Sequence, residues 1–363
     1  MSSRFIMLKN DPVIEITDDY KCIILDKDRL PIALRFESVS YDDVYHSWAE
    51  TRHMSIGRTN AKNILNALRL SQINQYKIAE AMHFATLTDC YWIKNYDENI
   101  TWEDVSLFRS SINQDIAETA LIGGAKIIEG KIRTPEPSVL GMSAKAWQVD
   151  PKGQLWLYKI SKKELAASII LDILDIPHVP YTQASDEEIA EITTIERLNK
   201  IKNSGEIIVK CPIITNEDTS IFTFEDYLSY CEGNGFADDY AYTSVIKDFG
   251  IDYYMMQIAD FILSNDDRHI GNWGFFMDNS SGKILSLHPL FDHDHAFSTE
   301  TEIPSQTGYN VETLEEAAKK AVSHVDIKAG IQRLIASPKP ALLSDEAWSR
   351  VIENSKILIN SCV

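Results

Sequence analysis

Three side chains in two short segments have the types and spacing that phosphoryl transfer requires. The first segment, residues 265–272, reads Asn-Asp-Asp-Arg-His-Ile-Gly-Asn and follows an apolar stretch that predicts a helix. The second, residues 289–295, reads Pro-Leu-Phe-Asp-His-Asp-His and follows a predicted strand. Phosphoryl transfer needs a carboxylate close to the attacking hydroxyl and oxygen ligands, typically an Asn amide and an Asp carboxylate, that hold Mg²⁺ against nucleotide phosphates. Asp267, Asn272 and Asp292 supply such a set.

Spacing alone does not establish this chemistry. Asp260 and Asn265 show the same spacing as Asp267 and Asn272, yet they fall inside a predicted buried helix and at its end. The assignment rests on a conjunction of an Asp and an Asn in a loop, a second carboxylate after a strand, and a lysine, Lys159, on an upstream predicted strand. Together these features favour a phosphotransferase that uses ATP and Mg²⁺.

The run Asn265-x-Asp267-x-His269-x-x-Asn272, with Asp292 after Pro-Leu-Phe, resembles the catalytic and metal-binding segments of HipA-like serine/threonine kinases. The resemblance implies that Asp267 is the catalytic aspartate and that Asn272 and Asp292 bind Mg²⁺, Asp292 in the role of the aspartate of the kinase DFG motif. His269 belongs to the same catalytic segment, where we expect it to order the loop rather than to transfer a proton. Phosphatidylinositol kinases share an Asp-Arg-His-x-x-Asn run, so a lipid kinase is an alternative.

The resemblance extends upstream to residues 138–145, Ser-Val-Leu-Gly-Met-Ser-Ala-Lys. This run is similar to the loop that covers the ATP phosphates in the family, whose serine can be autophosphorylated. The run has a single glycine, and Met142-Ser143 stands where small or amide residues are more usual. The residues that the resemblance implies for ATP binding are Ser138, which is also the autophosphorylation candidate, Gly141, Lys145, Lys159, Glu164, and Lys210 in an expected hinge strand, 208–212, against adenine.

Each of these charged residues also has a structural interpretation. Lys159 would serve as a solubilising charge on a strand edge, and Lys145 as part of a solvated surface. Glu164 opens a predicted helix, where an acidic side chain is favourable against the helix dipole. The resemblance favours instead an ion pair between Glu164 and Lys159 and a phosphate contact for Lys159.

The imidazoles and carboxylates around Asp292 support a rival hypothesis. His288, His293, Asp294 and His295 lie close to it in sequence, and such groups bind transition metals that activate water. A metal-dependent phosphohydrolase is therefore an alternative, although adjacent residues on a strand point in opposite directions and do not readily share one ion. A pseudokinase that acts as a binding module is a further alternative.

The elements that must position these residues predict an α+β chain. The resemblance implies a bilobal, protein-kinase-like fold of the HipA type, with a small β-containing N-lobe, a mostly helical C-lobe and an N-terminal accessory region. A Gly/Pro-rich passage, 123–137, marks the expected boundary, so the expected regions are 1–122, 123–212 and 213–363. Apolar periodicity predicts strands within 1–40 (including 30–34) and at 154–160, 206–210, 273–277 and 284–287, and helices at 60–70, 76–84, 102–108, 115–121, 162–174, 185–202, 240–263, 311–335 and 345–359.

Composition narrows the function classes. The 54 acidic residues outnumber 35 basic ones, giving a formal charge of −19, which disfavours direct binding of nucleic acid. Five cysteines without a C-x-x-C pair indicate reduced thiols, and no apolar run approaches the roughly 20 residues of a membrane span, so we expect a cytoplasmic protein. The expected partner is a protein substrate with a Ser or Thr acceptor. HipA-like toxins target aminoacyl-tRNA synthetases and pair with antitoxins, but no residue here specifies either one.

Overall fold

The N-terminal region builds a small sheet flanked by short helices. The computed structural model describes residues 3–70, 74–109, 112–124, 126–128 and 133–361. The first sheet is antiparallel, with strand order β3-β2-β1-β4. Its strands are β1 (Arg4–Leu8), β2 (Asp11–Ile16), β3 (Cys22–Ile24) and β4 (Tyr91–Asn95), and the helical elements of this region are η1 (Ile32–Leu34), η2 (Asp43–Trp48), η3 (Ala49–Arg52), α1 (Ala61–Ala67), α2 (Gln75–Ala81), α3 (Trp102–Val105), η4 (Leu107–Arg109) and α4 (Gln114–Ile122).

The strand predicted at 30–34 is wrong. Residues Ile32–Leu34 form the short helix η1 because Pro31 has φ −49° and has no backbone N–H for a sheet. Strand β4 was not predicted, since its pairing with β1 joins segments far apart in sequence. Its second residue, Trp92, is fully buried and donates its indole N–H to the Lys9 carbonyl.

The second part of the chain carries a four-stranded antiparallel sheet and one long helix. The sheet order is β5-β6-β8-β7. Helix α5 begins after Ser161, whose hydroxyl accepts the Glu164 amide, and it ends where Asp175 adopts a left-handed conformation. The elements are η5 (Glu136–Ser138), β5 (Lys145–Val149), β6 (Leu155–Ile160), α5 (Lys162–Leu174), β7 (Thr182–Gln183), α6 (Asp186–Ala190), α7 (Ile195–Asn203) and β8 (Ile208–Pro212).

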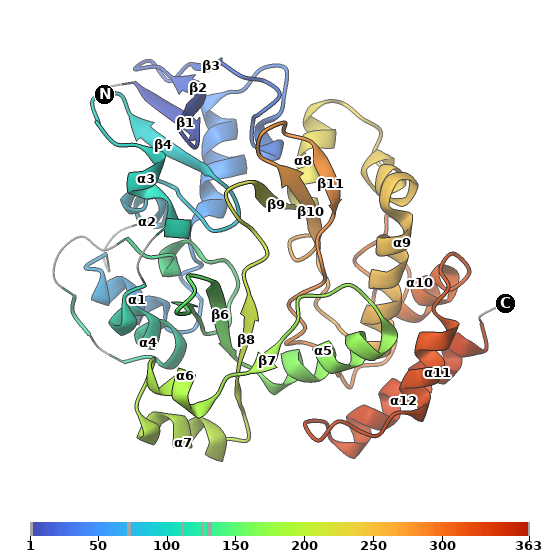
Figure 1. Cartoon of the computed structure of the whole chain (residues 1–363). Coiled ribbons are helices and arrows are strands. Elements are labelled where there is room, and N and C mark those ends of the chain that lie inside the picture. Colours follow the sequence, from blue (N-terminus) through green and yellow to red (C-terminus); the bar gives the residue numbers. More distant parts are fainter. Residues whose placement is uncertain (1–2, 71–73, 110–111, 125, 129–132, 362–363) are drawn as a thin grey trace.

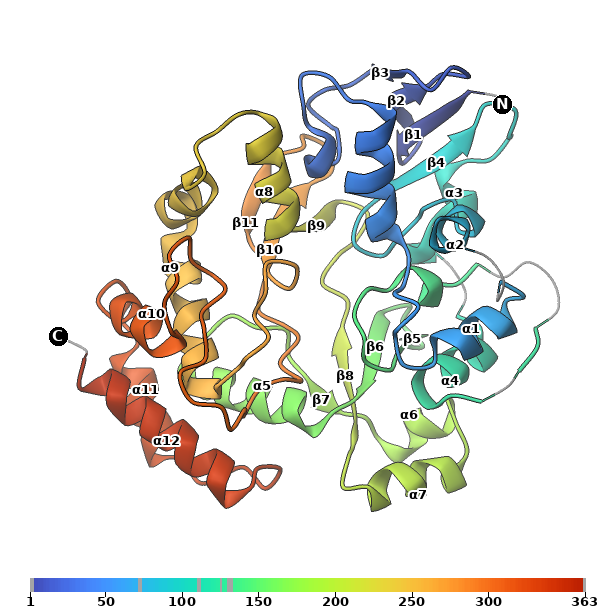
Figure 2. The ribbon, with the colours of Figure 1, turned by 180° about the vertical axis from the view of Figure 1, so that it is seen from behind.

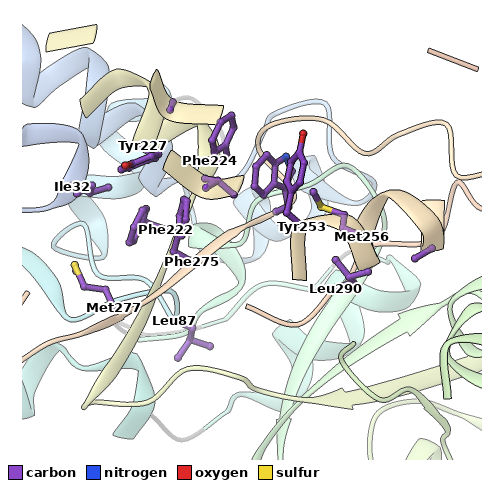
Figure 3. Packing of buried hydrophobic residues seen from close by; sticks show 14 of the residues in the cluster. Ile32, Leu87, Phe222, Phe224, Tyr227, Tyr253, Met256, Phe275, Met277 and Leu290 are labelled. Atoms are coloured by element: carbon purple, nitrogen blue, oxygen red, sulfur yellow. The ribbon is translucent and has the colours of Figure 1, made fainter. Parts of the chain in front are cut away.

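The third part is mostly helical around a three-stranded sheet of order β11-β10-β9. Figure 3 shows Phe222, Phe224, Tyr227 and Phe275 of this part packed together, and the Phe222 and Phe275 ring centroids are 5.0 Å apart. Gly274 has no room for a Cβ because the Phe222 carbonyl of the neighbouring strand lies against it. The elements are β9 (Thr219–Thr223), α8 (Phe224–Gly233), α9 (Tyr240–Leu263), β10 (Gly274–Asp278), β11 (Ile284–Leu287), α10 (Leu314–Ala321), α11 (Lys328–Ala336) and α12 (Asp345–Ile359).

The architecture is bilobal and kinase-like, as predicted. The sheet of β5–β8 with α5 forms the small lobe, and α8–α12 with β9–β11 form the large lobe, in which α10–α12 lie on the opposite side of the molecule from α1 and α4 (Figures 1 and 2). Helix α4 of the N-terminal region packs against β5 and β6, and Ala117, Ala120 and Leu121 share one apolar cluster with Ala146 and Tyr158. The N-terminal region and the small lobe therefore share a core. Within the described residues, no helix is long and apolar enough to cross a membrane.

Candidate active site

Lys159 lies where the two lobes meet, between two carboxylates. Its Nζ is 2.5 Å from Glu164 Oε1, one turn into α5, and 2.7 Å from Asp292 Oδ1 of the large lobe. The Lys159 and Glu164 side chains are buried, so their contact is shielded from water, whereas the Asp292 side chain is 28% exposed. Burial opposes the charge of Lys159, but Asp292 and Glu164 outweigh it and raise its pKa well above the ordinary value. Likewise, burial alone would raise the pKa of Asp292, but the Lys159 and Lys145 ammonium groups hold it far below its usual range.

Asp292 is held by the backbone on both sides. Its φ is +63°, a left-handed conformation that few residues other than glycine adopt and that is found often at functional sites. On its C-terminal side the His293 amide donates to Glu164 Oε2 at 3.0 Å. On its N-terminal side the Leu290 amide donates to the Pro177 carbonyl at 3.1 Å, and the Val179 amide donates to the Leu290 carbonyl at 2.8 Å. These hydrogen bonds attach the segment that carries Asp292 to the small lobe next to α5.

A buried arginine that sequence reasoning did not assign, Arg268, orders the loop after α9. Its side chain is 1% exposed and forms an ion pair with Asp260, with Nε at 3.1 Å from Oδ2. It also donates to the Asn272 carbonyl at 3.2 Å, to the Phe291 carbonyl at 2.8 Å and to His293 Nε2 at 3.0 Å. One guanidinium therefore joins the 265–272 loop to the 291–293 segment, which brings the two predicted catalytic segments together.

The Asp260 and Asn265 pair, whose spacing imitates the catalytic motif, is part of this support. Asn265 donates its side-chain amide to Asp260 Oδ1 at 2.9 Å, and both residues are buried. Because Arg268 and Asn265 both contact Asp260, this carboxylate serves to hold the loop. The signal in the sequence was a carboxylate inside an apolar helix, which requires a partner when buried.

Asn272 presents a buried side-chain oxygen that could meet a metal ion. Its side-chain Nδ2 donates to the Asp267 carbonyl at 2.5 Å, which turns Oδ1 the other way. Asn272 is only 4% exposed, yet Oδ1 has no hydrogen-bond partner among the described residues. A buried amide oxygen without a partner costs free energy unless a ligand meets it. Asn272 and the ionised Asp292 therefore fit the oxygen-ligand set of a divalent cation.

Asp267 and His269 complete the loop. Asp267 is half-buried, and among the described residues no donor pairs with its carboxylate, which leaves that carboxylate able to accept a proton. His269 is exposed, and its Nδ1 accepts the Gly271 amide at 3.0 Å. The His269 carbonyl accepts the Asn272 amide at 3.1 Å. These bonds are those of a residue that shapes the loop.

The predicted phosphate loop lies beside Lys159 on the same face of the small-lobe sheet. Lys145 pairs with Lys159 in the β5–β6 register, and its Nζ donates to the Leu140 carbonyl at 2.8 Å. Burial, with the Lys159 charge adding to it, lowers the pKa of Lys145 to about 8. Gly141 has φ +88°, and the Lys145 ammonium occupies the space that a Cβ would need. The loop is also tied to the large lobe, because Ser143 Oγ donates to Asp294 Oδ2 at 2.6 Å.

Ser138 and Lys210 lie differently from the predicted contacts. Ser138 is buried in η5 and donates its hydroxyl to the Pro135 carbonyl at 2.9 Å. Lys210 projects from the opposite face of the sheet, because the register pairs Lys159 with Val209 and successive strand residues alternate. There Lys210 forms an ion pair with Glu188 and lies over the Trp156 ring at 4.6 Å. The structure thus does not bring the Lys210 side chain to the group around Lys159.

The histidines near Asp292 are engaged in packing. His288 is buried, donates Nδ1 to the Pro289 carbonyl at 2.9 Å and stacks on Phe291. His293 accepts from Arg268, and burial together with that charge lowers its pKa well below the ordinary value. His295 is exposed and lies 3.3 Å from Asp266. In the described part of the chain no three His, Cys, Asp or Glu side chains are grouped to hold a metal ion.

Comparisons with known proteins bear on the fold. No protein-family model matches the chain, and no curated protein matches it. The structure of HipA from Shewanella oneidensis, determined with HipB and operator DNA, aligns with 99% of this chain and 96% of its own at 12% identity and a TM-score of 0.54. The Helicobacter pylori proinflammatory kinase CtkA aligns with 60% of this chain and 90% of its own at 14% identity (TM-score 0.38), and a Golgi casein kinase with 84% and 88% at 12% identity (TM-score 0.35). The likeness to HipA, over nearly the whole of both chains, shows that this chain has a bilobal kinase-like fold.

Proposed function

We propose that this chain is a protein serine/threonine kinase of the HipA-like type that uses ATP and Mg²⁺. The observation that carries the proposal is the meeting of Lys159 from the small lobe with Asp292 from the large lobe. Arg268 joins the Asp292 segment to the loop of Asn272, whose Oδ1 has no hydrogen-bond partner among the described residues. Lys159 and Lys145 supply positive charge for phosphates, and Gly141 of the loop lies against the Lys145 ammonium. Glu164 orients Lys159, as the 2.5 Å ion pair supports.

The chain's own residues account for the steps of phosphoryl transfer. Asp267 orients the acceptor hydroxyl and takes its proton while the hydroxyl oxygen bonds to the γ-phosphorus and the bond to the β-γ bridging oxygen breaks, which leaves ADP. Asn272 and Asp292 would hold Mg²⁺, which neutralises the phosphate charge when bound. Positioning and charge neutralisation then provide most of the rate enhancement.

Two finer parts of the proposal concern regulation and partners. Autophosphorylation of Ser138 requires the loop to open, since the hydroxyl is buried against the Pro135 carbonyl. A phosphate there carries about two negative charges and does not fit the buried position, so modification would hold the loop open and switch the enzyme off. A toxin role with an antitoxin partner is supported only by the likeness to HipA, which was solved with HipB.

Transfer of radiolabelled γ-phosphate from ATP tests the proposal. We expect Mg²⁺-dependent labelling of proteins in a cell extract, and we expect Asp267→Asn to reduce it roughly 10²- to 10⁴-fold, the usual contribution of a positioned acid–base group. Asp326→Asn, an exposed carboxylate outside the site, is the matched control and should label like wild type. Labelling of phosphoinositide vesicles instead of protein would assign a lipid kinase, and ATP binding without any transfer would assign a pseudokinase.

Calorimetric titration separates the kinase from a metal-dependent hydrolase. The kinase proposal expects ATP to bind in the presence of Mg²⁺ and Zn²⁺ or Mn²⁺ alone to bind weakly. Tight binding of Zn²⁺ or Mn²⁺ without nucleotide, together with phosphatase activity, contradicts it. Mass mapping of the Ser138 peptide after incubation with Mg-ATP checks whether Ser138 is autophosphorylated. An unmodified Ser138 in an enzyme that labels protein fully would exclude this regulation.

A further inference from the structure

The phosphate loop of the small lobe is held from outside by residues 54–59 of the N-terminal region. The Met54 amide donates to the Pro137 carbonyl at 2.7 Å, and the Thr59 amide donates to the Met142 carbonyl at 2.8 Å. Gly57 lies so close to Met142 that a Cβ there would meet its Cε at 2.9 Å. The segment 54–59 therefore runs along the loop and bonds to its backbone at two points.

Arg58, in the middle of this segment, joins the two ends of the loop. Its NH1 donates to the Glu136 carbonyl at 2.9 Å, and its NH2 donates to the Lys145 carbonyl at 2.6 Å. The guanidinium thus bridges the residues at the two ends of the loop, which the hydrogen bond from the Trp147 amide to Glu136 Oε1 at 3.3 Å also draws together. A planar fork with several N–H donors suits such a bridge, whereas a lysine ammonium cannot reproduce its fixed spacing.

The environment of Arg58 shows that it is committed to this bridge. Arg58 is 3% exposed, and among the described residues its Nε has no hydrogen-bond partner. Among the described residues no carboxylate lies within ion-pair distance of Arg58, although the buried Glu136 carboxylate partly offsets the burial that lowers the Arg58 pKa to about 10. The Arg58 charge acts on the Lys145 ammonium, which places a further positive charge behind the loop.

We propose that Arg58 is a positioning residue that shapes the phosphate loop for the triphosphate of ATP, so that the N-terminal region forms part of the nucleotide site. This inference rests on the proposed function. Arg58 acts through the loop, by fixing the distance between residues 136 and 145 and thereby the direction of the backbone between them. A loop ordered in advance loses less conformational entropy when it closes on the phosphates.

The inference makes a distinction between phosphate and base binding. Arg58→Met should weaken ATP affinity roughly tenfold to a hundredfold, the loss expected when hydrogen bonds from a charged group are removed from the loop. Adenosine, which lacks phosphates, should bind to the variant and to wild type alike. Arg58→Lys keeps the charge without the fork and should behave like Arg58→Met, whereas Arg69→Met, an exposed arginine at the end of α1, should behave like wild type.

Calorimetric titration of wild type and the variants with ATP and with adenosine gives both affinities, and circular dichroism confirms that each variant is folded. Equal losses for ATP and adenosine, or unchanged ATP affinity in both Arg58 variants, overturn the inference. If the wild-type protein does not bind ATP, the proposed function itself is wrong. The titration therefore distinguishes a failure of the proposed function from a failure of the role given to Arg58.

A measurement on wild type needs no variant. If the segment 54–59 braces the loop, hydrogen exchange of the Met54 and Thr59 amides should slow when ATP is added and stay unchanged with adenosine. This effect is expected because the Thr59 amide donates to the Met142 carbonyl of the loop and the Met54 amide donates to the Pro137 carbonyl, directly before the loop. Hydrogen-exchange rates of both amides that do not change when ATP is added would contradict the inference.

Discussion

The two segments that would face ATP from opposite sides are supported in different ways. The catalytic loop at 265–272 and the Asp292 segment are joined by side chains inside the large lobe, with Arg268 and Asp260 both fully buried. The phosphate loop at 138–145 is held at its ends by the Arg58 guanidinium and in its middle by single hydrogen bonds to Thr59 and Asp294, and its Gly141 and Met142 are exposed.

This difference indicates that the 265–272 loop and the Asp292 segment are rigid and that the 138–145 loop is able to move. A buried ion pair with all its partners in place has few alternative arrangements, and breaking it is costly. A loop whose middle is exposed and held by single hydrogen bonds opens at lower cost. The metal ligands and the catalytic aspartate would therefore form a rigid platform, and the phosphate loop would be the part that opens to admit ATP.

We expect the largest effect from a substitution that disrupts the buried network of Arg268 and Asp260. Arg268→Met leaves the Asp260 carboxylate buried and unpaired, and it should lower the free energy of unfolding by about 3–5 kcal/mol. Denaturant unfolding followed by circular dichroism measures this. Arg333→Met, which removes an exposed ion pair with Asp175, should cost about 1 kcal/mol or less. Similar losses in the two variants would show that the buried network does not hold the loop.

A second prediction concerns how the free energy of unfolding depends on pH through His288 of the large lobe. Burial lowers the pKa of His288 to about 4, with the hydrogen bond to the Pro289 carbonyl opposing this and the Arg268 charge adding to it. Since the unfolded imidazole has a pKa near 6.5, the unfolded state binds more protons between pH 6.5 and 4. The stability from this group is therefore present above pH 6.5 and is lost as the pH falls toward 4, by at most about 1.4 kcal/mol per pH unit.

The pH prediction is checked with His288→Gln. Unfolding free energies measured from pH 7 to pH 4.5 should fall less steeply in this variant than in wild type. His46→Gln, an exposed histidine of η2, should follow the wild-type slope. Parallel slopes for wild type and His288→Gln would mean that the imidazole is not kept neutral in the fold.

We expect the smallest change in the free energy of unfolding from a substitution in the phosphate loop at 138–145. Ser143→Ala removes the hydrogen bond to Asp294 that ties the phosphate loop to the large lobe. The free energy of unfolding should fall by only about 0.5–1.5 kcal/mol, the net contribution of one hydrogen bond. Exchange of the loop amides should nevertheless become faster. A loss as large as that of Arg268→Met would remove the contrast between this loop and the buried network of Arg268 and Asp260.

The sequence predicted local elements better than the contacts between distant ones. The predicted helices 162–174, 240–263 and 345–359 have the bounds of α5, α9 and α12, because each has a long apolar pattern and end signals. Strands β4 and β9 and helix α8 were not predicted, since short strands depend on partners far along the chain.

The candidate site shows the same limit. The segment around Asp267, Asn272 and Asp292 could be singled out from its residue types, and the ion pair of Lys159 with Glu164 followed from the resemblance. The direction of the Lys210 side chain, away from Lys159, could not be predicted because the face on which a strand residue points depends on register. Its place in an adenine-binding hinge stays a prediction. The Arg58 bridge has no local signal, since it connects positions 78 and 87 residues away.

We propose that Asn272 and Asp292 bind one nucleotide-associated cation between the lobes. A crystal structure with Mn²⁺ and a non-hydrolysable ATP analogue tests it directly, since the anomalous signal of manganese locates the ion. We predict one peak at about 2.1 Å from Asn272 Oδ1 and from the Asp292 carboxylate, with Lys159 on the phosphates. A nucleotide-bound ion elsewhere, with Asn272 Oδ1 still without a partner, would contradict the account.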